Sequence, residues 1–248
     1  MNQIKRLGYF CGIGMAILSV AADPVGDVQA ALERLGGAGS YTWKSETKTG
    51  KGTPPNRQGP IEGVTEGEGA TYFRFEMDGN VVETAFLGGH AAIRTETEWE
   101  SDAELVGERE WIARRLGTFQ APAVEAGDLL TKLGKLKKGR RGVYTGALTP
   151  AGVTALLALR SRDSAVATVA PGASGSVTFW LSKGEITKYE LEIRGKIMLK
   201  DYAQEVLVDR TTTVTISEVG ATKVTLPEAA KKKLLERPIS PFFPRSSQ

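Results

Sequence analysis

The chain has 248 residues, with 32 basic and 29 acidic side chains, a formal net charge of +3, one histidine and one cysteine. Because the single cysteine, Cys11, lies in the N-terminal segment, the remainder of the chain excludes a disulfide, a thiolate metal site and a cysteine nucleophile. The nearly balanced charge gives no support for nucleic-acid binding.

The first 22 residues have the composition of an export signal. Lys5 and Arg6 precede an uncharged apolar run over residues 7–20, and Ala21-Ala22 supplies the small residues of a cleavage site. This pattern predicts a cleaved secretory signal peptide, since the run is short for a transmembrane helix. An uncleaved N-terminal anchor is the alternative. Cleavage would leave 30 basic and 29 acidic residues in a soluble periplasmic or secreted protein.

The first hundred residues of the mature region predict one helix followed by strands. Asp23-Pro24 has the residues of a helix start, and Gly36-Gly37 marks the end of that helix. Asp78-Gly79 is a hairpin signal between two alternating runs. The predicted elements are a helix over residues 24–35 and strands over 40–48, 71–77, 81–87 and 90–100.

The middle of the chain predicts helices. Ser101 and Glu104 have capping-box spacing, which predicts a helix from that point to Gly117. Leucines at helical spacing predict a second helix over residues 123–138. A short strand over 142–148 and a third helix starting at Pro150 complete this part.

The last part predicts long antiparallel strands, with a Lys183-Gly184 turn between the first two. In the run over residues 185–199, Tyr189, Leu191 and Ile193 alternate with charged residues, so their side chains should be buried. The predicted elements are strands over 176–181, 185–199 and 205–217, a helix over 227–236 and a loose, proline-rich tail over 237–248.

The element order predicts an α+β fold with a single domain over residues 23–236. Every predicted strand has one apolar face, so one side of the sheet needs a cover, and the central helices are the candidates. We therefore expect a strongly curved antiparallel sheet, a half-barrel, whose concave side is covered by a few amphipathic helices. A cleft between these layers is a common place for a ligand.

Three groups of side chains have residue types that could carry chemistry. His90, the single histidine, is predicted to be a solvated surface residue, since the mature region has no second histidine or cysteine that could coordinate a zinc ion with it. The seven acids between residues 96 and 110 suit a cation, but a solvated sheet face and helix N-terminus account for them as well. Six bases over residues 132–141 suit an anionic membrane surface, or alternatively stabilise a helix C-terminus.

The late run over residues 176–189, and the ending Val224-Thr225-Leu226-Pro227, resemble the unclosed half-barrel carriers of bacterial envelopes, which include LolA, LolB and the LppX-type lipoproteins. The signal peptide, the helix before the sheet and the helical insertion are similar in order. The resemblance implies a curved sheet with a helical lid over an apolar cavity for acyl chains. The chain departs from the LppX type because Tyr9 and Phe10 precede its cysteine where a lipobox needs small residues.

Two functions stay open at this point. One is a carrier for a lipid acyl chain or a lipoprotein, monomeric and without a cofactor; the other is an envelope interaction domain in which the same face is a filled core. No nucleophile, base and orienting group can be assembled, so no enzyme is expected. The residues expected to line the acyl site are Phe73, Phe75, Phe86, Phe179, Leu181, Tyr189 and Leu191.

Overall fold

The computed structural model describes residues 23–53, 55–56, 58–67, 69–159, 166–199 and 204–235. The expected signal segment and C-terminal tail lie outside these residues. The helices are α1 (Pro24–Gly37), α2 (Glu110–Gly117), α3 (Pro122–Thr131), α4 (Pro150–Leu159) and α5 (Glu228–Leu235), with one 3-10 turn, η1 (Gly107–Arg109). The strands are β1 (Ser40–Thr49), β2 (Ile61–Glu66), β3 (Thr71–Met77), β4 (Asn80–Leu87), β5 (His90–Arg94), β6 (Trp99–Ser101), β7 (Leu133–Lys138), β8 (Val143–Leu148), β9 (Val166–Val169), β10 (Ser174–Ser182), β11 (Glu185–Leu199) and β12 (Gln204–Ser217).

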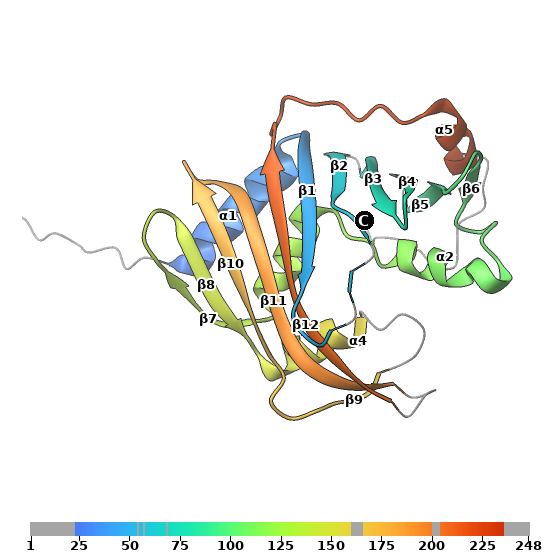
Figure 1. Cartoon of the computed structure of the whole chain (residues 1–248). Helices are drawn as coiled ribbons and strands as arrows, with labels where there is room; N and C mark the ends of the chain where they lie inside the picture. The colour runs from blue at the N-terminus through green and yellow to red at the C-terminus, as the bar shows by residue number, and fades with distance from the viewer. Residues whose placement is uncertain are drawn as a thin grey trace, which may run out of the picture.

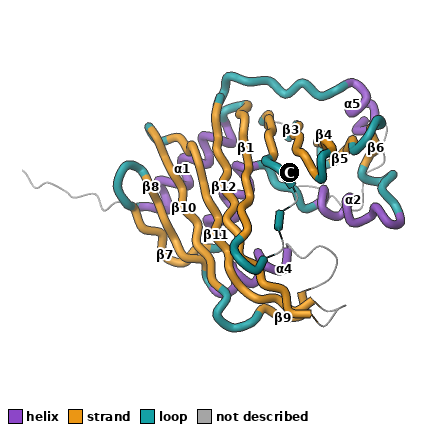
Figure 2. The backbone as a smooth tube through the Cα atoms, viewed as in Figure 1, coloured by secondary structure: helices purple, strands orange, loops and turns teal. Residues whose placement is uncertain are grey.

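The α+β class and the antiparallel sheet are confirmed. In the described chain, twelve strands form one open sheet in the order β6-β5-β4-β3-β2-β1-β12-β11-β10-β8-β7, and β9 pairs with the far end of β11 (Figures 1 and 2). The N-terminal strand β1 pairs with β12, so the first and last strand groups join at the centre of the sheet. The sheet is not closed into a barrel.

The tight hairpins form where the turn residues accept a positive φ. Asp78 and Gly79 have φ angles of 51° and 83° between β3 and β4, and Lys183 and Gly184 have 53° and 82° between β10 and β11. Two consecutive residues with positive φ give the turn whose twist matches that of antiparallel strands. These turns set the register that brings Phe73 opposite Thr84 and Phe179 opposite Tyr189.

One face of the sheet carries the main apolar cluster. Tyr189, Leu191 and Ile193 are at most 2% exposed, whereas the charged residues that alternate with them are half-buried or exposed, as predicted. Helices α1 to α4 all contribute buried apolar residues to this cluster. Among these helices, α1 contacts β7, β10 and β11, and α4 contacts β8 to β11.

Helix α5 packs on the opposite face of the sheet. There Ala230 and Leu234 form a smaller cluster with Ala85, Ala92 and Trp99. A continuous strand over residues 90–100, as predicted, would place Trp99 on the same face as Ala91 and Ile93. That prediction is wrong, because the strand breaks at a turn. Its two parts, β5 and β6, pair with each other, which aligns Trp99 with Arg94 and brings it beside Ala92 on the α5 side.

The predicted helix over residues 123–138 is wrong in its second half. Helix α3 ends at Thr131, and residues 133–138 form β7, the terminal strand of the sheet, paired with β8. Leucine and lysine favour helices, but intrinsic helix propensity is a small energy that pairing with a neighbouring strand overrides. Leu133 and Leu136 therefore pack from a strand and not from the helix.

The helix predicted to begin near Ser101 starts later. The Glu104 carboxylate does accept hydrogen bonds from the Ser101 backbone N–H and hydroxyl, at 2.8 Å and 2.6 Å. However, Gly107 has a φ of 63°, outside the range of a right-handed helix, so η1 begins only at Gly107 and α2 only at Glu110. Of the described helices, none is long and apolar enough to span a membrane.

Candidate functional site

The structure brings all seven predicted lining residues to one apolar cluster. Phe73 and Phe75 come from β3, Phe86 from β4, and the others from β10 and β11. Alternation along each strand points them to the same face of the sheet. Five of the seven are at most 7% exposed, while Phe75 and Leu181 are half-buried.

Four aromatic rings gather at the β1–β4 end of the cluster. The Phe119 ring lies 4.6 Å from Phe86, 5.0 Å from Phe73 and 6.1 Å from Trp43, measured between ring centroids. Phe119 follows α2 in a loop, so it closes the aromatic group without belonging to a strand. Sequence reasoning missed Phe119, because a phenylalanine in a loop carries no periodic signal.

Trp43 itself depends on a close approach of two strands. It lies opposite Gly63, where an added Cβ would be 2.3 Å from the indole ring. Its indole N–H donates to the Thr65 hydroxyl at 3.0 Å. The glycine therefore leaves the space that this ring occupies beside β2.

Two tyrosine hydroxyls attach α3 to the sheet. Tyr189, on β11, donates a hydrogen bond of 2.5 Å to the carboxylate of Glu125. Tyr41, on β1, accepts a hydrogen bond of 3.3 Å from the backbone N–H of Ala123. Burial raises the pKa of Tyr41, so its hydroxyl stays protonated. We call these two hydrogen bonds the tyrosine tethers, because they attach α3 to the apolar face of the sheet.

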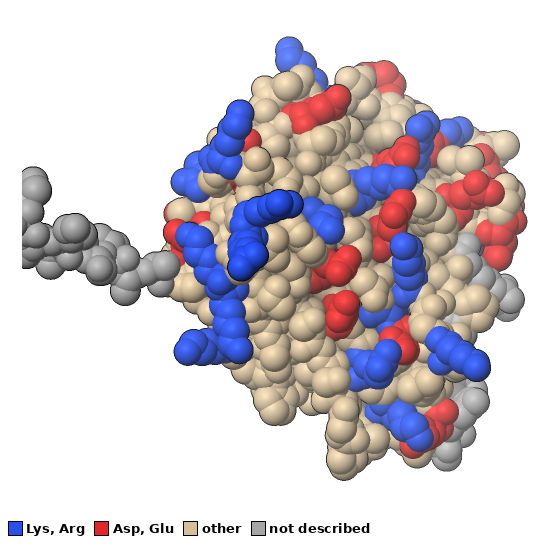
Figure 3. All heavy atoms as spheres, turned by 60° about the vertical axis from the view of Figure 1, so that its left-hand side comes forward, with Lys and Arg blue, Asp and Glu red and all other residues tan. Residues whose placement is uncertain are grey.

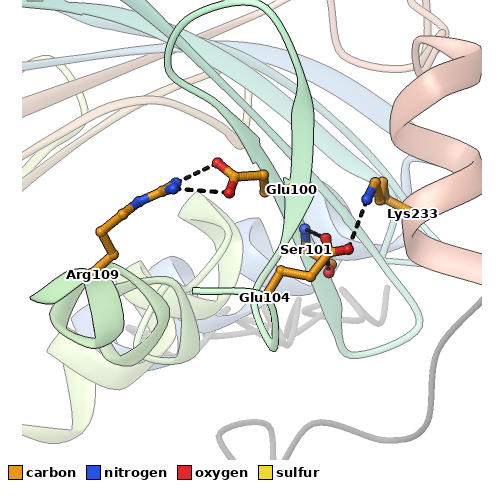
Figure 4. A network of polar contacts seen from close by, with 5 residues as sticks. All are labelled: Glu100, Ser101, Glu104, Arg109 and Lys233. Carbon is orange, nitrogen blue, oxygen red and sulfur yellow. Dashed lines mark hydrogen bonds and ion pairs between the residues drawn. The ribbon is translucent and has the colours of Figure 1, made fainter. Parts of the chain in front are cut away.

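A polar network holds the chain between β6 and α2 (Figure 4). Arg109 of η1 makes a two-pronged ion pair with Glu100 of β6, and Lys233 of α5 donates to Glu104 at 2.7 Å. Partial burial raises the pKa of Glu104, but hydrogen bonds from Lys233 and Ser101 outweigh it and lower the pKa to about 2. These contacts fix the loop that leads to α2 at its start, through Ser101 and Glu104, and at its end, through Arg109.

Two hollows lie at the described surface, outside most of the apolar cluster. One has a volume of about 680 Å³ and lies between one side of α1, the β7–β8 turn and the β10–β11 turn. The other, of about 750 Å³, lies over β1, β2, β3 and β12 and has mainly polar and charged side chains. The first hollow shares Tyr144 and Leu181 with the apolar cluster, and the second hollow shares Trp43 with it.

The other sequence candidates do not converge on a reactive site. His90 is half-buried at the start of β5. Glu96 and Glu98 lie in the turn between β5 and β6, not on a strand face as expected, and Glu100 pairs with Arg109. Within the described residues, no group of three or more metal-ligating side chains could hold an ion.

Comparison with models of known protein families and with curated proteins finds no match to this chain.

Proposed function

We propose that the protein is an exported carrier that shelters the acyl chain of a lipid or lipidated partner between the sheet and α2–α3. One observation carries the proposal: candidate lining residues from two separate strand pairs share one apolar cluster, and Phe119 closes it from a loop. In this proposal the open sheet is the curved half-barrel of the envelope carriers, with the helices as its lid. Affinity would come from apolar area removed from water.

The helical segment is attached in a way that suits a lid. Where Phe119 meets the sheet, its ring stacks on Phe86 and Trp43, and the tyrosine tethers attach α3. Separating α2 and α3 from the sheet would break these contacts and leave the strand pairing intact. A ligand chain would then replace the Phe119 ring against Phe73 and Phe86.

A filled-core interaction domain is the second candidate, and burial favours it. Phe179 is 0% exposed and Tyr189 is 1% exposed, so in this form their surroundings are already packed. A carrier in its closed form has the same appearance. Ligand binding by the purified protein separates the two functions.

Two buried alanines provide a matched experiment. Ala91 lies opposite Phe86 on the cluster face, and Ala85 lies on the other face against α5; both are 0% exposed. Phenylalanine at either site overpacks its surroundings, which should lower the free energy of unfolding by about 1–3 kcal/mol. We expect the wild type and Ala85→Phe to bind the fluorescent fatty acid cis-parinaric acid, and Ala91→Phe to lose binding while it remains folded.

The outcomes separate the candidates. Lipid that co-purifies from the native envelope in native mass spectrometry, together with the loss specific to Ala91→Phe, supports the carrier. A wild type that carries no lipid and does not bind cis-parinaric acid overturns it and leaves the filled-core domain. Equal loss in both variants would show that binding follows stability and not the cluster face.

A further inference from the structure

Exposed basic residues gather around the β7 edge of the sheet. Lys135, Lys137, Arg140 and Arg141 on β7 and its turn are exposed, and so is Lys183 on the neighbouring β10–β11 turn. Figure 3 shows lysine and arginine side chains gathered on this side of the molecule. We call these five residues the basic edge.

Among the described residues, the basic edge gathers several bases without an ion pair in one place. On other strands, several bases pair with acids across strands, as in Arg194–Asp209, Lys196–Glu205 and Arg74–Glu62. Within the described chain, no ion pair is found for any residue of the basic edge. Unbalanced positive charge at one edge attracts an anionic partner, and salt weakens that attraction.

Two structural explanations account for the basic edge only in part. Cations can stabilise a helix C-terminus, but α3 ends at Thr131 and residues 133–138 are a strand. Lysines on a terminal strand also discourage pairing with another chain, which accounts for Lys135 and Lys137. Arg140, Arg141 and Lys183 lie in turns, where neither explanation applies.

The hollow of about 680 Å³ opens beside the basic edge. Its lining includes the bases Arg34, Lys138, Arg141 and Lys183, and a single carboxylate, that of Asp27. Two of these bases are held in place by their neighbours. Arg34 donates to the Gly184 carbonyl through Nε and Nη2, at 3.1 Å and 2.5 Å, and Lys138 donates to Asp27 at 2.7 Å.

The acid in the hollow is already neutralised. Hydrogen bonds from Lys138 and from Tyr144 lower the pKa of Asp27, so it stays ionised and paired with Lys138. The other three bases, Arg34, Arg141 and Lys183, leave the lining with a net positive charge. Ala30 and Leu181 add apolar surface to it.

We infer that the basic edge and its hollow dock the protein on a bilayer that contains anionic phospholipid, with a headgroup phosphate in the hollow. Several bases on one surface match a sheet of phosphates, and the two turns present them together. Leu181 lies both in the hollow and against the apolar cluster, so a docked surface would adjoin the proposed acyl site. Docking does not depend on that site.

The test is sedimentation with vesicles of phosphatidylglycerol and phosphatidylcholine, compared with vesicles of phosphatidylcholine alone. Each basic residue near such a surface contributes about fivefold in binding. We expect the double variant Arg141→Gln/Lys183→Gln to bind anionic vesicles on the order of 25-fold more weakly. Lys48→Gln/Lys232→Gln removes the same charge from exposed positions on β1 and α5 and should bind within about twofold of the wild type.

Three results would overturn docking. These are equal binding to both kinds of vesicle, equal loss in the two double variants, and saturable binding of inorganic phosphate by a protein that does not sediment with anionic vesicles, which indicates a small-anion site. Thermal unfolding of each variant checks that the fold is intact. Binding of cis-parinaric acid is measured in parallel, so a failure of docking and a failure of the carrier proposal are distinguished.

Discussion

Removing the hydroxyl of Tyr189 should loosen α3 without changing the packing of the apolar cluster. Phenylalanine keeps the ring, which is 1% exposed, and deletes the donor to Glu125. A hydrogen bond to a charged group contributes about 1.5–3 kcal/mol. Because Glu125 is half-buried and water can replace the lost donor, we expect the lower end, about 1.5 kcal/mol.

This loss predicts a local change in hydrogen exchange. A free energy of 1.4 kcal/mol corresponds to a tenfold change in an equilibrium, so amides of residues 122–131 should exchange about tenfold faster in Tyr189→Phe. Amides of β11, in the centre of the sheet, should change much less. Exchange measured by mass spectrometry resolves the two segments.

Tyr144→Phe is the matched control. Tyr144 is also buried in the cluster, but its hydroxyl donates to Asp27 of α1 at 2.8 Å, so its removal should leave α3 unchanged. If Tyr189→Phe exchanges like the wild type over residues 122–131, the tether does not hold α3. If β11 and α3 accelerate equally, the substitution destabilises the whole fold, and the reasoning about a separable lid is refuted.

Two further predictions concern stability. Gly63→Ala should displace the Trp43 indole and break its hydrogen bond to Thr65. We expect the free energy of unfolding, measured with urea, to fall by about 1–3 kcal/mol. An unchanged unfolding midpoint would contradict the close approach of Trp43 to Gly63. Glu104 has a folded pKa of about 2, below its usual 4.5, so its contribution is complete above pH 4.5 and is lost as the pH falls towards 2. Since the Glu104 side chain is 41% exposed, this contribution is about 1 kcal/mol after solvent screening. Glu104→Gln should therefore flatten the pH dependence of the unfolding free energy between pH 4.5 and 2; a profile parallel to that of the wild type would refute the assignment.

Local patterns in the chain determined most of the strands. Alternation over residues 185–199 and the Asp78-Gly79 and Lys183-Gly184 turns predict β3, β4, β10 and β11 closely, because period-two burial and positive φ are properties of neighbouring residues. The faces of the predicted lining residues followed from the same alternation. The strands β2 and β9 were missed, since each is short and has a weak pattern.

The tertiary structure decided what depends on contacts between distant residues. Residues 133–138 have helix-forming side chains but form a strand because β8 lies beside them. The pairing of β1 with β12 and the arrival of Phe119 among the aromatic rings join residues far apart in the sequence. The basic edge has the same origin: its bases lie in two separate turns, and only the packing of β7, β8, β10 and α1 brings them to one surface. A periodic pattern reports the environment of a single element, whereas a site is made where elements meet.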